Sequence, residues 1–498
     1  MARARIAGRR PGSLAAALAL LAGLIAAALL AGAGSHATAQ QLAAGAHRPN
    51  IIVVMTDDQN VGDDKVMKRV QHDLVNRGVT FENFFATFPL CCPSRTTYLT
   101  GQYAHNHGVE SNTPRTGGGF PAFDDSKTTA VALHRDGYEV AQIGKFLNGY
   151  PGVANQNPDT IPAGFDRWFV ALNKTMYDWS ADDQGVIRQY SGQRKYQTNV
   201  YARKAVDFVK DATDKGKPFW LTVATHAPHG ESKVKNFPNP RPAPRDYGRF
   251  DNVPLPKPPS FNEKDVSDKP AFLQVPRLKP KEIEELREKY DSRLASLLAV
   301  DRLVGRLVDQ VRSLHEMRDT WFMFTSDNGY LFGQHRMTRK TVLYDESARV
   351  PLIIRGPKDE LPRGVTRKQF AGNIDLSPTI LDIAGVRPLL TVDGMSLLPV
   401  AADPRRHQHR DILLENEKSQ ALRTRHWMYA EHDTNDDSVP DEFELYNMKS
   451  DPYQLRNRYQ ASLDPLRHSK LATARQQLAL RLDQLRNCAG RGGADPCD

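Results

Sequence analysis

Two adjacent cysteines stand at the head of the segment "CCPSRTTYLTGQ", in a chain that has only four cysteines among its 498 residues. The residue types alone leave two interpretations of this pair open. Cys91 and Cys92 could form a strained vicinal disulfide, or they could bind zinc together with His105 and His107. Adjacent cysteines rarely suit tetrahedral coordination, however, and neither interpretation gives Arg95 a role.

Polar side chains end two of the strongest hydrophobic runs. Asp57 and Asp58 follow "PNIIVVMT", and Asp327 and Asn328 follow "DTWFMFTS". At a strand end, each pair alone is typical of a turn or a cap. Taken together, the four side chains offer hard oxygen ligands that suit Ca²⁺ or Mg²⁺ better than a soft metal. They therefore predict a divalent metal site.

The spacing of Cys91, Pro93, Ser94 and Arg95 resembles the signature of the sulfatase family, and the continuation "TTYLTGQYAHNHGV" strengthens the match. The resemblance extends through most of the chain, from residue 49 to about residue 456. It implies that the first cysteine is oxidised to formylglycine by a formylglycine-generating enzyme. Its neighbour is then only the variable position that follows the converted residue.

The resemblance also assigns roles to charged residues elsewhere. It implies that the metal, usually calcium, is bound by the four strand-end residues and by the formylglycine oxygen. Arg95, Lys145 and Lys340 would steady the aldehyde hydrate and neutralise the sulfate oxygens, where negative charge develops. His229 would protonate the leaving oxygen, a task that suits a histidine beside a proline at a strand end.

One position departs from the pattern of many sulfatases. Where these carry a histidine two residues after the active-site lysine, this chain has Leu147, followed by Asn148. The segments "GKFLNGY", "CCPSR" and "AHNHGV" resemble instead the N-acetylglucosamine-6-sulfatase branch, and we expect Asn148 to take over part of the polar role. Specificity is expected from a rim that includes Trp168, Tyr177 and Trp179, whose rings could stack on a sugar or an aryl group.

The elements that must position these residues alternate along the chain. Short hydrophobic runs with polar ends predict strands at 49–58, 138–146, 218–229 and 319–329, and a further one at 350–357. Helical spacing of apolar residues predicts helices at 199–212 and 282–314. This alternation indicates a parallel sheet, whose strands end at one edge and would bring the polar residues together.

The resemblance and this alternation together predict an α/β fold like that of alkaline phosphatase, with a mixed, mostly parallel sheet flanked by helices. We expect a catalytic domain at 40–405, including a proline-rich surface excursion at about 237–280 that could shape the substrate rim. After residue 405 the pattern changes to antiparallel strands and a helix near 469–487. This change predicts a smaller α+β domain at 406–498.

The first 39 residues have the pattern of a signal peptide. Four arginines precede the apolar run "SLAAALALLAGLIAAALLAGAG", and small residues allow cleavage after Ala39. The run is also nearly long enough to remain as a membrane anchor. If it is cleaved, we expect no membrane contact afterwards and a secreted or periplasmic protein. Oxidising conditions then favour a disulfide between Cys488 and Cys497 over two free thiols.

The charge distribution argues against nucleic-acid binding. The formal net charge of +9 falls to +5 without the leader, which holds four arginines and no acid, and acids interrupt the basic residues elsewhere. The resemblance to the sulfatases implies instead an enzyme that hydrolyses sulfate esters of carbohydrate and of small aryl alcohols. The alternatives are an arylsulfatase, a phosphate or phosphonate ester hydrolase on the same fold, and an inactive module that binds sulfated glycans.

Overall fold

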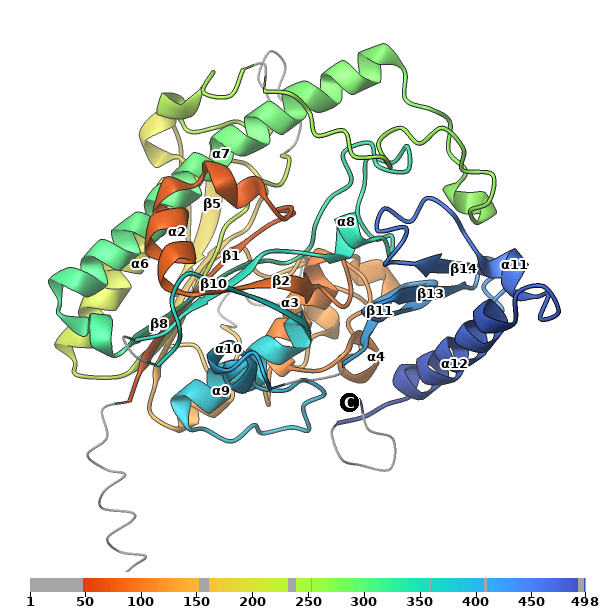
Figure 1. The fold of residues 1–498 in the computed structure, drawn as a ribbon. Coiled ribbons are helices and arrows are strands. Elements are labelled where there is room, and N and C mark those ends of the chain that lie inside the picture. Colours follow the sequence, from red (N-terminus) through yellow and green to blue (C-terminus); the bar gives the residue numbers. More distant parts are fainter. Residues whose placement is uncertain are drawn as a thin grey trace, which may run out of the picture. The chain divides into compact units, whose positions relative to one another are not determined.

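The computed structural model of the protein describes residues 48–151, 161–231, 239–251, 253–357, 360–406, 410–490 and 497. The predicted leader and its cleavage point lie outside these residues. Within the described ranges, no helix combines the length and the apolar character needed to span a bilayer. Two sheets organise the part of the chain that begins at residue 49 (Figure 1).

The larger sheet has ten strands. In spatial order they are β10 (Val365–Gly372), β2 (Val79–Phe85), β9 (Leu352–Arg355), β8 (Thr320–Ser326), β1 (Asn50–Thr56), β7 (Phe219–Ala224), β3 (Glu139–Gly144), β4 (Arg167–Ala171), β5 (Trp179–Asp183) and β6 (Val186–Tyr190). Neighbours are parallel except where β9 pairs with β2 and β8, and where β5 pairs with β4 and β6. The five predicted strands are confirmed as β1, β3, β7, β8 and β9.

The central strand β1 is hydrophobic along its whole length because helices cover both faces of the sheet. Its side chains alternate: Ile51, Val53 and Met55 pack on one side, and Ile52 and Val54 on the other. The Ile52 side is covered by α2 (Lys68–Asp73), α6 (Gln197–Asp214) and α7 (Pro280–Ser313). The Ile51 side is covered by α3 (Cys91–Thr100), α5 (Thr129–Arg135), α9 (Leu376–Ala384) and α10 (Leu398–Ala402). Figure 1 shows α3, α9 and α10 together on this side. The two predicted helices are α6 and α7.

Helix α3 carries the cysteine motif and is buried at all ten of its residues. Pro93 lies in its first turn, where the missing N–H would have no partner within the helix. The helix ends at Gly101, whose φ of 74° lies in the left-handed region that favours glycine. Local sequence therefore defines both ends of the helix that presents Cys91.

The smaller sheet lies in the C-terminal part of the chain. Its antiparallel strands are β11 (Ile412–Asn416), β12 (Ser419–Arg423), β13 (Trp427–His432) and β14 (Glu442–Asn447), accompanied by α11 (Tyr459–Ser462) and α12 (Ser469–Arg486). One face packs on α12 through Leu413 and Leu422, and the opposite face packs against Phe85 of the larger sheet. The predicted α+β character is confirmed. Because the two sheets share a hydrophobic cluster, the boundary at residue 405 stays a prediction.

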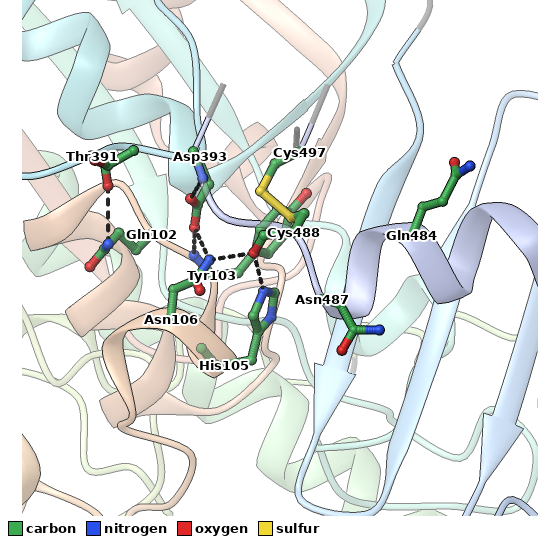
Figure 2. Close-up of a disulfide and its surroundings, with 12 residues drawn as sticks. Gln102, Tyr103, His105, Asn106, Thr391, Asp393, Gln484, Asn487, Cys488 and Cys497 are labelled. Carbon is green, nitrogen blue, oxygen red and sulfur yellow. Dashed lines mark hydrogen bonds between the residues drawn. A yellow bond between two sulfur atoms is a disulfide. The ribbon is translucent and has the colours of Figure 1, made fainter. Parts of the chain in front are cut away.

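A disulfide joins Cys488 to Cys497 beyond α12, with a Cα–Cα distance of 5.1 Å. Figure 2 shows that its surroundings tie the tail to α4 (Ala104–His107). The carbonyl of Cys488 accepts hydrogen bonds from His105 Nε2 at 3.0 Å and from Asn106 Nδ2 at 2.9 Å. The other ring nitrogen of His105 lies 2.7 Å from Glu415 Oε1. Both partners of the imidazole are acceptors, which favours its protonated form.

Candidate active site

Four neighbouring strands of the larger sheet, β8, β1, β7 and β3, are parallel and end at the same edge. Asp57 and Asp58 directly follow β1, and Asp327 and Asn328 directly follow β8. Lys145 is the first residue after β3. The predicted convergence of strand-end side chains is therefore present, since these residues contact one another.

The acidic residues form a buried cluster. Asp57, Asp58 and Asp327 are 0%, 2% and 0% exposed. Asp327 Oδ1 accepts a hydrogen bond from the backbone N–H of Asp58 at 3.1 Å, and Asn328 Nδ2 donates to Asp58 Oδ1 at 2.6 Å. Asp57, Cys91 and Asp327 offer ligand atoms that all lie within 4.8 Å of one another. Because most of the donors are hard oxygens, the cluster fits a divalent cation such as Ca²⁺ or Mg²⁺.

Each carboxylate of the cluster has a cation at close range, and Asp327 Oδ2 also lies 4.0 Å from Lys145 Nζ. The pairs are Lys145 Nζ with Asp57 Oδ2 at 2.5 Å, Lys340 Nζ with Asp58 Oδ1 at 2.5 Å, and Arg95 Nη2 with Asp327 Oδ2 at 2.8 Å. Burial alone would raise the pKa of Asp57, but the positive charge of Lys145 and its neighbours holds that pKa well below its ordinary value. The site is thus a set of ionised acids matched by cations in a buried environment.

Cys91 is the first residue of α3 and faces this cluster. Its Sγ lies 2.9 Å from Lys340 Nζ and 3.5 Å from Asp57 Oδ1, and the residue is 1% exposed. Burial and the charge of Asp57 raise the pKa of the thiol, despite the nearby lysines. An unmodified cysteine at this position is therefore held as a thiol rather than as the reactive thiolate.

Lys340 comes from a loop rather than from a strand end. The following residue, Thr341, has a φ of 74°, which is strained for a β-branched side chain. Its backbone N–H donates to the carbonyl of Pro89 at 3.2 Å, and its carbonyl accepts from Asn416 Nδ2 at 2.8 Å. Because Asn416 ends β11, the smaller sheet helps to hold Lys340 against the cluster.

His229 follows β7 and lies at the more open side of the site. Its Nε2 lies 3.7 Å from Asp58 Oδ2, and its side chain is 23% exposed. The Nδ1 atom contacts the carbonyl of Gly230, so Nδ1 carries a proton and Nε2 is the nitrogen that faces the acids. Burial lowers the pKa of this imidazole, and the negative charges of Asp57 and Asp58 offset this effect only in part.

The second cysteine has a different environment. Cys92 Sγ accepts a hydrogen bond from the backbone N–H of Asn148 at 3.1 Å, on the side of the helix away from the acids. Leu147 is buried in the core and contributes no polar group to the site. Asn148 is thus beside Cys92, and the polar role expected of its side chain stays a prediction.

Both alternative interpretations of the cysteine pair are wrong. Cys91 and Cys92 are free thiols, so no vicinal disulfide is present. His107 Nε2 lies 3.0 Å from Thr97 Oγ1, and His105 is directed to Glu415 and the C-terminal tail. The two histidines therefore have partners of their own and form no zinc site with the cysteines.

The expected aromatic rim is also corrected. Trp168 and Trp179 are 0% and 1% exposed and donate their indole N–H groups to Tyr150 and to the carbonyl of Lys195. Tyr177 is buried as well and bonds the carbonyl of Pro242. These rings fill the core on the β4–β6 side of the sheet, so they cannot stack on a substrate.

Sequence reasoning did not identify Arg293 as a site residue. It lies on α7 and is 1% exposed. Its guanidinium donates to the carbonyl of Asp58 and, at 2.9 Å, to the carbonyl of Pro228. It therefore links the segments that follow β1 and β7. Its only signal in the sequence was a position on the apolar face of a charged helix.

A cavity of about 510 Å³ opens beside the site, between the loops that flank Cys91 and Lys340 and the smaller sheet. Leu90 and Thr341, the direct neighbours of Cys91 and Lys340, form its inner wall. Phe272 of the proline-rich excursion and residues at the ends of β11 and β13 form its outer walls. This cavity is large enough for a sugar unit and lies next to the reactive cluster.

The mixed sheet covered by helices on both faces, together with the polar cluster at its strand ends, places the protein in the alkaline-phosphatase-like α/β class. A solved structure of a protein in complex with its substrate D-glucosamine-2-N,6-O-disulfate has this fold too. It matches 91% of this chain and 99% of its own length with a TM-score of 0.68 and 24% identity.

The chain belongs to the sulfatase family, because the Sulfatase family model matches residues 49–386. A second model, described as N-sulphoglucosamine sulphohydrolase, C-terminal, matches residues 333–487. The human N-acetylglucosamine-6-sulfatase is 33% identical over 367 residues, which cover 71% of this chain and 64% of that protein. An extracellular sulfatase Sulf-1 homologue of Caenorhabditis elegans is 32% identical over 363 residues, which cover 71% of this chain and 49% of that protein. The chain thus spans about half to two thirds of the length of these two relatives.

Proposed function

We propose that the protein is a secreted or periplasmic sulfuric ester hydrolase that uses formylglycine at position 91 to desulfate carbohydrate. The observation that carries this proposal is the position of Cys91, which faces three buried carboxylates and Lys340 at the edge of the sheet. Membership of the sulfatase family supports the conversion of Cys91 by a formylglycine-generating enzyme. The export pattern of the first 39 residues supports the location.

The reaction proceeds in two displacements at residue 91. Hydrated formylglycine carries two hydroxyl groups on one carbon. One hydroxyl gives its proton to Asp57, whose Oδ1 lies 3.5 Å from Cys91 Sγ, and its oxygen attacks sulfur while the bond from sulfur to the ester oxygen breaks. His229, protonated at both ring nitrogens for this step, gives its Nε2 proton to the departing alcohol. The second hydroxyl then returns a proton to His229, the bond from carbon to the sulfate oxygen breaks, and sulfate leaves as the aldehyde re-forms. A serine or a thiol lacks the second hydroxyl needed for that release.

The charged side chains around residue 91 suit the binding of a sulfate group. Lys340 and Lys145 are aimed at the position where the sulfate oxygens gain negative charge, and Arg95 fixes the carboxylate of Asp327. The four strand-end residues would hold Ca²⁺, or Mg²⁺ in its place, which when bound polarises oxygen atoms and lowers the pKa of a coordinated hydroxyl. The side chains of this chain bind and orient the ester, and His229 moves the proton.

The substrate class rests on the relatives and on the cavity. The human relative carries the name N-acetylglucosamine-6-sulfatase, and the cavity beside Lys340 offers both polar walls and the exposed ring of Phe272. We infer that a 6-sulfated amino sugar occupies this cavity with its sulfate at residue 91. Small aryl sulfates should react as well, because a good leaving group needs little help from the cavity walls.

The test combines a mass measurement with a substrate panel. The tryptic peptide that contains residue 91 should lose one sulfur and two hydrogens and gain one oxygen. The matured protein should hydrolyse N-acetylglucosamine-6-sulfate and an aryl sulfate faster than matched phosphate and phosphonate esters. Faster phosphate or phosphonate hydrolysis would reject the sulfatase assignment. Aryl turnover without sugar desulfation would reject the carbohydrate substrate, and glycan binding without turnover by the converted protein would indicate an inactive binding module.

A further inference from the structure

The cavity beside the site has one wall with an unusual cation. Arg339 lines the cavity and directly precedes Lys340. Lys340 turns inward, with its Nζ 2.9 Å from Cys91 Sγ and 2.5 Å from Asp58 Oδ1. Two consecutive cations are thus directed to two different places, one at the reacting group and the other at the space beyond it.

Among the described residues, the guanidinium of Arg339 forms no side-chain hydrogen bond or ion pair. The residue is exposed, yet burial of part of its side chain lowers its pKa. The other cation of the cavity differs in this respect, because Lys418 Nζ lies 2.7 Å from Asp436 Oδ2. A partly desolvated, unpaired guanidinium is a favourable contact for an anion that arrives with a ligand.

Three acids also line the cavity, Glu417, Asp433 and Glu444. Glu444 bonds His432 at 3.0 Å and Tyr344 at 2.7 Å, and Asp433 accepts the backbone N–H of Ser438 at 2.9 Å. The oxygens of Asp433 and Glu444 are therefore already engaged, whereas Glu417 is exposed on the turn that also carries Lys418. Arg339 is thus the cation of the cavity lining that has no acid beside it among the described residues.

We propose that Arg339 is a specificity-determining residue that binds a second anionic group of the substrate, a sulfate or a carboxylate. The group is carried by the sugar that bears the scissile sulfate or by the sugar next to it. This inference rests on the proposed function, because it requires the scissile sulfate to lie at residue 91. It adds that the preferred substrate carries at least two negative charges.

The kinetic test compares three substrates that share a 6-sulfate. These are N-acetylglucosamine-6-sulfate, glucosamine-2-N,6-O-disulfate, and 6-sulfated N-acetylglucosamine linked to a uronic acid. The wild type should prefer at least one of the two dianionic compounds. In Arg339→Gln, kcat/KM for that compound should fall by about 10- to 150-fold, since a charged hydrogen bond is lost, while the monosulfated sugar changes by less than about threefold. Which compound responds identifies the anion as sulfate or carboxylate.

Two further variants make the test specific. Arg339→Lys keeps the charge without the planar fork and should recover part of the preference. Lys418→Ala removes the paired cation of the same cavity and should leave the preference unchanged. An equal loss on all three substrates, an unchanged preference in Arg339→Gln, or no preference in the wild type would overturn the proposal.

A binding measurement separates this proposal from the proposed function. Calorimetric titration of the Cys91→Ala protein with the same three sugars requires no turnover. The preferred dianionic sugar should bind more tightly than N-acetylglucosamine-6-sulfate, and adding Arg339→Gln should abolish the difference. If the wild type is inactive but this difference is present, the catalytic proposal fails and the anion site stands. If the wild type is active and the difference is absent, the anion site is rejected alone.

Discussion

The two adjacent cysteines offer a matched pair of substitutions. Cys91 and Cys92 are 1% and 0% exposed, and each Sγ has a polar contact, with Lys340 in one case and with the backbone of Asn148 in the other. Replacing either residue by alanine removes one buried sulfur and one weak hydrogen bond. We expect each change to lower the free energy of unfolding by about 1–2 kcal/mol. Any larger difference in activity therefore reports chemistry rather than folding.

Activity should separate the two variants sharply. Cys91→Ala removes the residue for which we propose conversion, and kcat for an aryl sulfate should fall by roughly 10⁴-fold or more. Cys92→Ala leaves the acids, the cations and residue 91 in place, so most of the activity should remain. Turnover is measured at saturating aryl sulfate and divided by the converted fraction, which the mass of the peptide containing residue 91 provides.

The controls are the unfolding midpoint in urea and the peptide mass of each variant. Similar midpoints with a large difference in activity would support the assignment of residue 91. The reasoning is refuted if Cys91→Ala keeps wild-type turnover, or if both variants lose activity equally while Cys92→Ala remains folded and fully converted.

Three other predictions concern the metal and the C-terminal tail. Exhaustive chelation should abolish turnover, and added Ca²⁺ or Mg²⁺ should restore it, because three buried carboxylates share one cluster. Full activity in protein that elemental analysis shows to be free of metal would contradict this prediction. Contact with Glu415 outweighs the effect of burial and raises the pKa of His105 to about 9. Protonation of this imidazole therefore stabilises the fold by up to about 3 kcal/mol below pH 6.5. This contribution to the free energy of unfolding is lost as the pH rises through about 9. The unfolding midpoints of wild type and His105→Gln should therefore converge between pH 6 and pH 9.5, and a constant gap would disprove the linkage. Replacing Cys488 and Cys497 together by serine opens a loop with a sequence separation of 9 and should lower the free energy of unfolding by about 2–3 kcal/mol. Turnover should be nearly unchanged. An unchanged unfolding midpoint would contradict this prediction.

The centre of the sheet was predictable from sequence because its strands are buried on both faces. Runs such as "NIIVVMT" and "TWFMFTS" have polar residues only near their ends and lack the polar–apolar alternation of a half-exposed strand. The strands away from the centre were not predicted. The edge strand β6 (Val186–Tyr190) is mostly exposed, and β5 (Trp179–Asp183) ends in two acids, so neither has a hydrophobic pattern that marks a strand.

The candidate site was predictable as far as its residues lie at strand ends or in the cysteine motif. Lys340 could not be placed from local sequence alone, because its position beside Cys91 depends on a loop. Thr341 of this loop is held by Asn416, which lies 75 residues further along the chain. Arg293 could not be recognised either, since a buried arginine on a long helix has the same local pattern as an exposed one. The error at Trp168 arose because a large ring fills a core as readily as it forms a binding surface.

The complete burial of helix α3 has a consequence for how the active protein can be made. Residues 91–100 are all buried in the folded chain, so the proposed conversion of Cys91 requires the modifying enzyme to bind this segment before it folds. Modification and folding then compete in time, and the fraction of molecules that carries the aldehyde depends on the ratio of two rates. Conditions that delay folding of the chain should raise that fraction, and rapid folding should trap molecules that are native in structure but permanently without the catalytic group.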